Sequence, residues 1–231
     1  MAERFAIYYA PAPTDALWER AAIWLGRDPA DGDRFDGPVA GIERDRLLNL
    51  TQSASRYGFH ATLKAPMALE PGMLLDDLTA ALTGFAATHA PVDLGRLELN
   101  SIDGFLALTP TGSAEAIQDF ASHVVEDFDP FRAQMSLKDR AARMGRGLTP
   151  RQEELLDAYG YPYVFEEFQF HMTLSDRLAE TDHTELRTAA QTWFGPVLDA
   201  PVLLDRLSLF TEAENGRPFR RTADFLLQGA L

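Results

Sequence analysis

Two short segments of the sequence carry a histidine and a threonine in the same spacing. One reads Phe59-His60-Ala61-Thr62-Leu63, and the other reads Phe170-His171-Met172-Thr173-Leu174. Side chains alternate between the two faces of a β-strand, so each histidine shares a face with its threonine and has apolar residues behind it. Imidazole changes its charge near neutral pH, which suits general acid and general base catalysis. The repeated pattern therefore predicts a site in which His60 and His171 are catalytic.

Two opposed histidines fit an in-line displacement at a phosphodiester. One ring deprotonates an incoming water or hydroxyl and the other protonates the leaving alkoxide, while Thr62 and Thr173 donate hydrogen bonds to the phosphate oxygens. This scheme requires no metal and no cofactor, and we expect neither. The motifs of zinc proteases (His-Glu-x-x-His), serine hydrolases (Gly-x-Ser-x-Gly) and P-loop or dinucleotide-binding proteins do not occur, which disfavours those classes.

The similarity between the two halves extends beyond these motifs. Residues 92–99 and 202–209 are alike, and Arg96 lies 36 positions after His60 while Arg206 lies 35 positions after His171. Nearly equal spacing of two landmarks indicates an internal duplication. We predict a single bilobed, pseudo-two-fold domain over residues 1–231, with one repeat at about 1–110 and the other at about 111–231. The two histidine strands are expected to face each other across a central cleft.

The composition limits the class of protein. The chain has 231 residues, 46% of them hydrophobic, no cysteine and a formal net charge of −14. This length and apolar content suit one sizeable core, and disulfides are excluded. The apolar run 5–10 is too short for a signal peptide or a membrane span, so we expect a cytoplasmic protein without a membrane partner. The acidity disfavours a broad RNA-binding surface but allows a small anionic substrate held by a few local cations.

Local patterns predict the secondary structure. Strands are expected at 4–9, 55–66, 92–99, 105–109, 165–174, 202–210 and 223–227. Helices are expected to begin at Thr14, Pro71-Gly72, Ser113, Thr149 and Thr181, the first ending at Gly26 and the last at Gly195-Pro196. This order predicts an α+β fold of two mainly antiparallel sheets with helices on their outer faces.

A basic stretch interrupts the repeat. Residues 138–151 hold five Lys and Arg residues against one acid, Asp139. Thr149-Pro150-Arg151-Gln152 has the pattern of a capping box with proline at the first helical position. The stretch is either a solvated helix and loop or a flap that carries cations toward an anionic substrate.

The two His-x-Thr motifs resemble those of the two-histidine phosphoesterase superfamily, which includes LigT-like RNA 2',3'-cyclic phosphodiesterases. The resemblance covers essentially the whole chain and implies a bilobed α+β fold. It also implies acid and base roles for His60 and His171 and phosphate binding by Thr62 and Thr173. The flanking residues 56–66 and 160–163 resemble a bacterial subfamily associated with phosphonate metabolism, whose members are encoded near carbon–phosphorus lyase genes.

Five further residues are candidate substrate contacts. Alternation places Lys64 on the catalytic face of the first strand, where it either contacts phosphate or sugar or extends to solvent. Ser175 continues the second face at the corresponding position. Arg56, Tyr57 and Arg177 are candidates by their position next to the motifs.

Three functions are compatible with these patterns. The first is a metal-independent cyclic phosphodiesterase acting on a small phosphorylated sugar or nucleotide, in phosphonate metabolism. The second is an RNA-end 2',3'-cyclic phosphodiesterase or 2'-5' ligase, for which residues 138–151 would grip the RNA. The third is a non-catalytic phosphate-ligand sensor or assembly protein. The sequence leaves the oligomeric state open.

Overall fold

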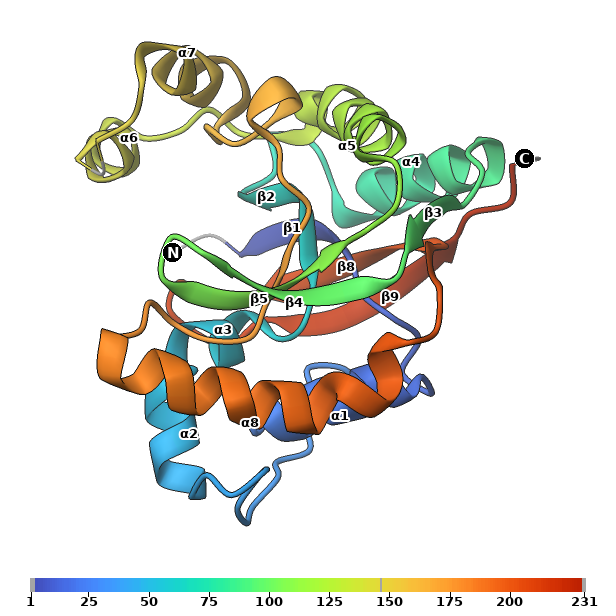
Figure 1. Ribbon diagram of the computed structural model, residues 1–231. Helices are drawn as coiled ribbons and strands as arrows, with labels where there is room; N and C mark the ends of the chain where they lie inside the picture. The colour runs from blue at the N-terminus through green and yellow to red at the C-terminus, as the bar shows by residue number, and fades with distance from the viewer. Residues whose placement is uncertain (1–2, 146, 230–231) are drawn as a thin grey trace.

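The computed structural model describes residues 3–145 and 147–229, and in it helices cover both outer sides of antiparallel sheets (Figure 1). Every strand pairing in this part of the chain is antiparallel, which confirms the predicted α+β class. The described strands form three sheets, whereas the sequence predicted two.

The sheets combine strands from both halves of the chain. The largest has the order β2 (Ala61–Met67), β1 (Arg4–Tyr9), β8 (Arg206–Glu212) and β9 (Arg220–Leu226). The second has the order β4 (Leu97–Ile102), β5 (Phe105–Pro110) and β6 (Met172–Thr173). The C-terminal hairpin β8–β9 thus completes the sheet of the first histidine motif. The N-terminal hairpin β4–β5 completes the sheet of the second.

The third sheet consists of two short strands that correspond in the two repeats. β3 (Val92–Gly95) pairs with β7 (Val202–Leu204), and Asp93 lies opposite Leu203, its counterpart in the repeat alignment. A local two-fold relation therefore passes between these strands. This pairing connects the two larger sheets, because β3 leads into β4 and β7 leads into β8.

Two predicted strands are broken at the same place in each repeat. The strand expected at 92–99 divides into β3 and β4, and that expected at 202–210 divides into β7 and β8. Gly95 stands at the first break with φ +64°, a conformation that L-residues rarely adopt. Asp205 stands at the second break and forms an ion pair with Arg206. The breaks let each chain segment leave the small sheet and enter a large one.

The histidine strands are shorter than predicted. Residues 55–57, expected as strand, belong to helix α3 (Gln52–Tyr57), and β2 begins only after His60 and continues through Pro66. Residues 165–167 form a 3₁₀ helix (η2, Phe165–Glu167), so β6 contains only two residues. Loops before each strand therefore position the imidazoles, while the strands position the threonines.

Helices form two layers around the sheets (Figure 1). α4 (Leu75–Thr88) and α5 (Ala114–Phe128) lie on one side and contact β9 and β2, respectively. α8 (Glu180–Leu198) and α1 (Ala16–Leu25) pack against each other on the opposite side, where α8 covers β4. α2 (Arg44–Leu50) lies next to α1 and was absent from the sequence prediction.

Four predicted helix ends are wrong in detail. α4, expected to begin at Pro71-Gly72, begins at Leu75. Asp15, rather than Thr14, caps α1 by accepting a hydrogen bond from the Leu17 amide at 2.7 Å. α8 begins after Ala179 without a side-chain cap, so Thr181 is already inside the helix. α8 also continues through Pro196 to Leu198, because a proline so close to the end disturbs only the last turn. The predicted stops and caps at Gly26, Ser113 and Thr149 are confirmed.

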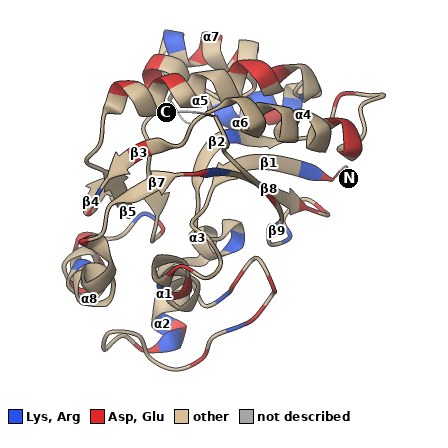
Figure 2. Cartoon of the chain, turned by 90° about the vertical axis from the view of Figure 1, so that its right-hand side faces the viewer, with Lys and Arg blue, Asp and Glu red and all other residues tan. Residues whose placement is uncertain are grey.

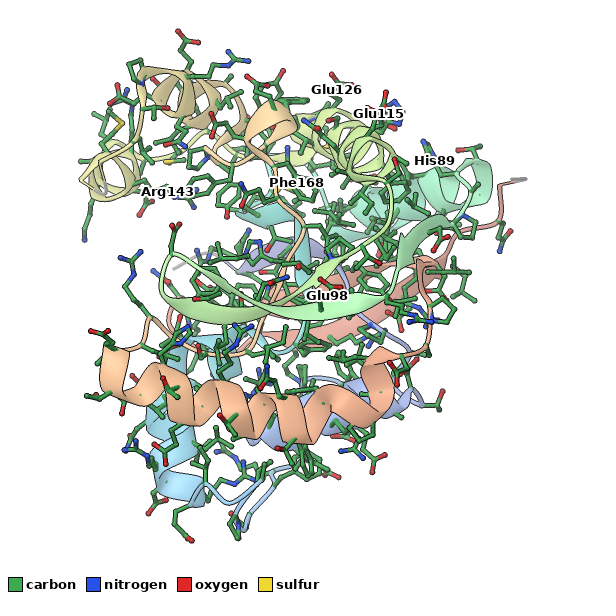
Figure 3. The ribbon with its side chains drawn as sticks, in the orientation of Figure 1. His89, Glu98, Glu115, Glu126, Arg143 and Phe168 are labelled. Carbon is green, nitrogen blue, oxygen red and sulfur yellow. The ribbon has the colours of Figure 1, made fainter. Side chains whose placement is uncertain are left out.

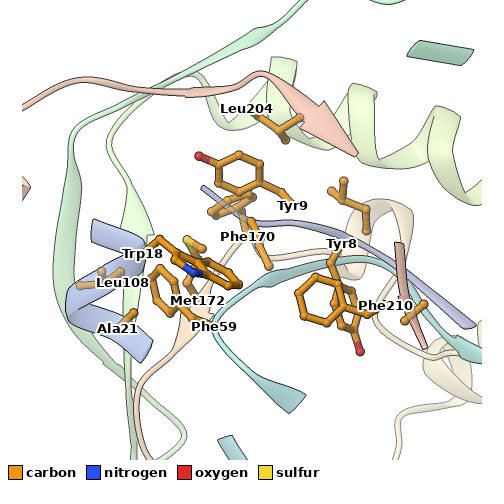
Figure 4. Packing of buried hydrophobic residues seen from close by; sticks show 14 of the residues in the cluster. Tyr8, Tyr9, Trp18, Ala21, Phe59, Leu108, Phe170, Met172, Leu204 and Phe210 are labelled. Atoms are coloured by element: carbon orange, nitrogen blue, oxygen red, sulfur yellow. The ribbon is translucent and has the colours of Figure 1, made fainter. Parts of the chain in front are cut away.

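One continuous core fills the space between the helices and the sheets (Figure 4). It contains the residues behind both motifs: Phe59, Ala61, Leu63, Phe170, Met172 and Leu174. The alternation of faces read from the sequence is therefore confirmed on both sides. Since this core is shared by all sheets, the two His-x-Thr segments rest on a common rigid support.

The basic stretch forms an appendage of two helices, α6 (Leu137–Met144) and α7 (Pro150–Tyr159), at one edge of the molecule (Figures 1 and 3). A small separate apolar cluster anchors α7 through Leu155 to Val125 of α5. Exposed ion pairs join Arg140 to Asp157 and Arg151 to Glu154 and Glu166. Arg146 of the predicted basic stretch lies outside the described residues.

Acidic side chains lie along outer helices such as α5 and α7, where they face away from the sheets (Figure 2). Much of the negative charge of the chain is therefore carried by its outer helices.

Among the described residues, no helix combines the length and apolarity needed to cross a membrane.

The strand break at Gly95 requires a residue without a Cβ atom, and replacing Gly95 by alanine tests this requirement. A Cβ there would lie 2.6 Å from Thr111 Oγ1 and 2.9 Å from the Gly112 amide nitrogen. We expect Gly95→Ala to lower the free energy of unfolding by about 2–3 kcal/mol, from the left-handed backbone and the clash together. Urea unfolding measures it. Gly41→Ala is the matched control, with φ +83° and open space around the new Cβ, and should cost about 1 kcal/mol. Equal losses in both variants would contradict the role of the clash.

Candidate active site

A cleft with a volume of about 1060 Å³ opens between the two larger sheets and the α6–α7 appendage. Both motifs contribute to its walls, through His60 and Thr62 on one side and Thr173 and Ser175 on the other. β2 contacts β6, so the segments that carry the motifs lie together although 111 positions separate the two histidines in the sequence.

The loop before β2 fixes the first imidazole. His60 Nδ1 lies 2.8 Å from the carbonyl oxygen of Gly58, and Nε2 lies 3.2 Å from Thr62 Oγ1. Gly58 has φ +82°, and a Cβ there would lie 2.7 Å from Pro29. The ring stacks on Tyr8 with centroids 3.7 Å apart. Burial lowers the pKa of His60 to about 4, and the charge of the nearby His171 acts in the same direction.

The second imidazole is held in the same way. His171 Nδ1 lies 2.8 Å from the carbonyl oxygen of Gln169, again two residues earlier, and its ring lies 5.6 Å from that of Phe105, which lines the cleft. Burial lowers the pKa of His171 as well. A carbonyl can only accept, so each neutral ring carries its proton on Nδ1. Nε2 of each ring is left with a lone pair that can take up a proton.

Ser175 and Asp176 connect the second motif to the first. Ser175 Oγ accepts a hydrogen bond from the Leu106 amide at 2.9 Å and donates to the Asp176 carbonyl at 2.8 Å. The Asp176 carboxylate accepts from the amide of Ser53 at 2.9 Å, at the start of α3. Helix α3 leads directly into Gly58 and His60. Ser175, predicted as a substrate contact, lines the cleft but has its hydroxyl committed to these backbone groups.

The prediction for Lys64 is wrong. Its side chain is 3% exposed and does not line the cleft; Nζ donates to the Val125 carbonyl at 2.9 Å and to Asp129 at 2.7 Å. The register of β1 and β2 shifts between the pairs Ile7–Lys64 and Tyr8–Thr62, which adds a residue to β2. Such a bulge breaks the alternation of faces from which the prediction was made. Lys64 therefore ties β2 to α5.

The remaining candidates line the cleft, together with cations that the motif analysis missed. Arg56, Tyr57 and Arg177 are in its walls. In total, the described lining residues include six cations (Arg4, Arg56, Arg132, Lys138, Arg143 and Arg177) and two carboxylates (Asp139 and Asp176). Lys138 and Arg143 belong to the basic stretch, so the flap interpretation is supported for these two residues. Arg4 and Arg132 have no sequence signal, because they lie far from both motifs.

The cleft is therefore positive in a strongly acidic chain. Within residues 3–145 and 147–229, no group of three or more His, Asp or Glu side chains is placed to hold a metal ion. The arrangement of two coupled imidazoles, two hydroxyls and excess cations suits an anion with several oxygens.

A family model places the chain among known sequences. The model of the family described as "Protein of unknown function (DUF1045)" matches residues 62–220. The chain belongs to this family. The matched region includes the second motif and begins at Thr62 of the first.

Two curated relatives of this DUF1045 chain carry the same name, ribose 1,5-bisphosphate phosphokinase PhnN. The protein from Janthinobacterium sp. (strain Marseille) is 37% identical over 222 residues, and that from Laribacter hongkongensis (strain HLHK9) is 34% identical over 223 residues. Each alignment covers 94% of this chain but 49% and 50% of the relative. The chain thus spans about half the length of these relatives.

Solved structures give a weaker likeness. E. coli LigT complexed with NADP+ and with 3'-AMP covers 98% of this chain, and 98% and 99% of its own, at 12% and 14% identity with TM-scores of 0.42. The protein TT0787 of Thermus thermophilus covers 99% of this chain and 100% of its own at 19% identity, also with a TM-score of 0.42.

The low pKa of His60 predicts a pH-dependent stability. Between about pH 6.5 and pH 4 the unfolded chain binds a proton on this residue that the folded protein does not. The free energy of unfolding should therefore fall as the pH is lowered through this window. Urea titrations of the wild type and of His60→Gln measure the difference, and the variant should show the shallower fall. An identical slope in both proteins would show that His60 does not titrate in this way.

The corrected role of Lys64 predicts a loss of stability rather than of catalysis. Lys64→Met leaves the Val125 carbonyl without its donor and removes one partner of Asp129, which should cost about 2–3 kcal/mol. The control is Lys138→Met, because Lys138 is the only other lysine and is exposed. Urea unfolding should separate the two variants. If the folded Lys64→Met protein instead bound inorganic phosphate about tenfold more weakly at unchanged stability, Lys64 would be a ligand contact after all.

Proposed function

We propose that the chain is a two-histidine phosphoesterase that hydrolyses a small cyclic phosphate ester without a metal ion. The observation that carries this proposal is the pair of imidazoles, each held by a backbone carbonyl at Nδ1, on two segments whose strands β2 and β6 contact each other. The positive cleft, which is lined by His60, Thr62 and Thr173, supports an anionic substrate. His171 is not in its lining, but the His171 ring lies 5.6 Å from that of Phe105, which is.

In the proposed reaction a water oxygen attacks phosphorus while the opposite P–O ester bond breaks. Nε2 of one histidine takes the proton from the water, and Nε2 of the other gives a proton to the leaving oxygen. Atoms and charge balance, because the pair gains one proton as it loses one. Thr62 and Thr173 would donate hydrogen bonds to the non-bridging phosphate oxygens, as positioned donors do for developing charge.

This division of labour needs one protonated and one neutral ring. Burial lowers the pKa values of both rings in the structure. A phosphodiester bound between them would raise both values, because a nearby negative charge favours the protonated form. Repulsion between the rings then disfavours a second proton. The bound state would therefore carry one shared charge, which is the state that acid–base catalysis requires.

A ribose cyclic phosphate is the substrate we propose, in cytoplasmic phosphonate metabolism. The name of the two relatives refers to a ribose carrying phosphate groups. The phosphokinase activity in that name is not transferred, since the chain covers half of those proteins and has no Gly-x-x-x-x-Gly-Lys motif. Hydrolysis of a cyclic ester of the same sugar uses only the groups found in the cleft.

RNA ends are a less favoured substrate. Arg140 and Arg151 of the basic stretch are paired with carboxylates at the exposed edge, so little net positive charge remains there for an RNA backbone. A purely ligand-sensing role would not require both Nε2 atoms to be kept available. Both alternatives are outcomes of the assay that follows.

The proposal predicts a strict requirement for both histidines. His60→Ala and His171→Ala should each lower kcat/KM by about 10²–10⁴, the usual contribution of a positioned acid or base. Thr62→Ala and Thr173→Ala should lower it by about 10- to 100-fold, since each removes one hydrogen bond to a charged group. Product release from ribose cyclic phosphates, nucleoside 2',3'-cyclic phosphates and an RNA ending in a cyclic phosphate, all with chelator present, is the measurement.

Each alternative has its own signature in this panel. Preference for the RNA, with binding that weakens steeply with salt, would assign the chain to RNA-end processing. A rise in melting temperature with a cyclic phosphate but no product would indicate a sensor. Near wild-type rates in both single histidine variants would refute the catalytic assignment.

A further inference from the structure

One wall of the cleft holds two arginines on a single buried carboxylate. Glu212 is 0% exposed, and its two oxygens accept from Arg4 and from Arg56, one each. Both guanidinium groups line the cleft and are 25% and 28% exposed. Two guanidinium groups and one carboxylate leave this wall with a net charge of +1, because Glu212 can neutralise only one of the two arginines.

Aromatic rings fix the directions of these guanidinium groups. Arg4 and Arg56 lie 5.8 and 5.9 Å from the centroid of Phe219, and Arg56 also lies 4.9 Å from that of Tyr57. The Phe219 ring is buried. Planar guanidinium groups held over rings lose little freedom on binding and match the oxygens of a phosphate. The arrangement is therefore pre-organised for an anion.

The arginine wall is close to the histidine pair but separate from it. The Arg56 guanidinium lies over the Tyr57 ring, and the centroid of that ring lies 6.2 Å from the centroid of the His60 ring. Tyr8, which stacks on His60, also packs toward Phe219. About one ring therefore separates Arg56 from His60. A single sugar is of similar width, so one small molecule can engage both.

The number of cations exceeds what the reaction centre needs. A cyclic phosphodiester carries one negative charge, yet the described lining residues have six cations against two carboxylates. On the opposite wall, Arg132 is committed to Asp129 and to the Ala158 carbonyl. The guanidinium groups of Arg4 and Arg56, by contrast, share one carboxylate between them and stay partly exposed to the cleft. The arginine wall thus offers two partly exposed guanidinium groups, both supported by aromatic rings, to a second anionic group.

We infer that Arg4 and Arg56 form a subsite for a phosphate monoester carried by the same molecule as the cyclic phosphate. The inference rests on the proposed function and narrows it: the substrate is a sugar with a cyclic phosphate at one end and a phosphate monoester at the other. Glu212 and Phe219 act as positioning residues, because they hold the guanidinium groups and do not touch the ligand.

The kinetic test compares a ribose cyclic phosphate with and without a phosphate on its 5-hydroxyl. The wild type should hydrolyse the 5-phosphorylated form with at least about tenfold higher kcat/KM. Arg4→Gln and Arg56→Gln should each reduce this preference by about tenfold, because kcat/KM falls mainly on the 5-phosphorylated form. Arg46→Gln is the control, since Arg46 is likewise ion-paired, with Asp182 and Glu185, but lies outside the cleft. Equal rates on both compounds in the wild type would overturn the subsite.

A binding test remains decisive even if neither compound is hydrolysed. Ribose 5-phosphate should bind the wild type and His60→Ala equally in calorimetry, and about tenfold more weakly in Arg4→Gln and Arg56→Gln. Loss of binding in His60→Ala with retention in the arginine variants would place this phosphate at the histidines and refute the subsite. If a glutamine variant unfolds because Glu212 loses a partner, Arg4→Lys and Arg56→Lys keep the charge and remove the planar fork. They should still weaken binding severalfold.

Discussion

The structure depends on keeping two imidazole rings, carried by different sheets, within electrostatic reach of each other. Neither ring lies inside a regular strand, so the sheets alone do not fix their separation. Asp176 makes the connection by binding the amides at the start of α3, the helix that leads into His60. Ser175 fixes the adjacent backbone to β5. A short polar link between the second motif and the approach to the first therefore sets the geometry of the pair.

Positive side chains line the cleft next to this pair, whereas negative side chains lie on the outer helices. The chain has a net charge of −14, but the cleft is lined by an excess of cations. Carboxylates on the outer helices are solvated and screened over about 8–10 Å, so they weakly affect the interior of the cleft. Net charge alone thus says little about what the site binds.

Much of the candidate site could be predicted, because side chains alternate between the two faces of a strand and the sequence therefore indicates which residues share a face. The pattern identified His60, Thr62, His171 and Thr173 and the apolar residues behind them. It failed at Lys64, where a bulge adds a residue and sends the lysine to α5. Bulges leave no reliable mark in a single sequence.

Long-range features were beyond the sequence for a different reason. Arg4 reaches the cleft because β1 pairs with both β2 and β8, and Glu212 meets it from the far end of the chain. No local pattern encodes that meeting. The breaks at Gly95 and Asp205 were also missed, since the apolar pattern continues across both. The two breaks do lie at corresponding positions of the proposed repeat, before Arg96 and before Arg206.

The exchange of hairpins between the halves has a consequence for the edges of the sheets. Half a chain would leave β1 with a bare edge where β8 now pairs, and would leave β5 exposed where β6 now lies. Unpaired edges recruit other strands, most readily from an identical molecule. In this chain each hairpin covers such an edge within the same molecule, so the pairing that holds the histidine segments together also removes two sites at which strands of other molecules could add.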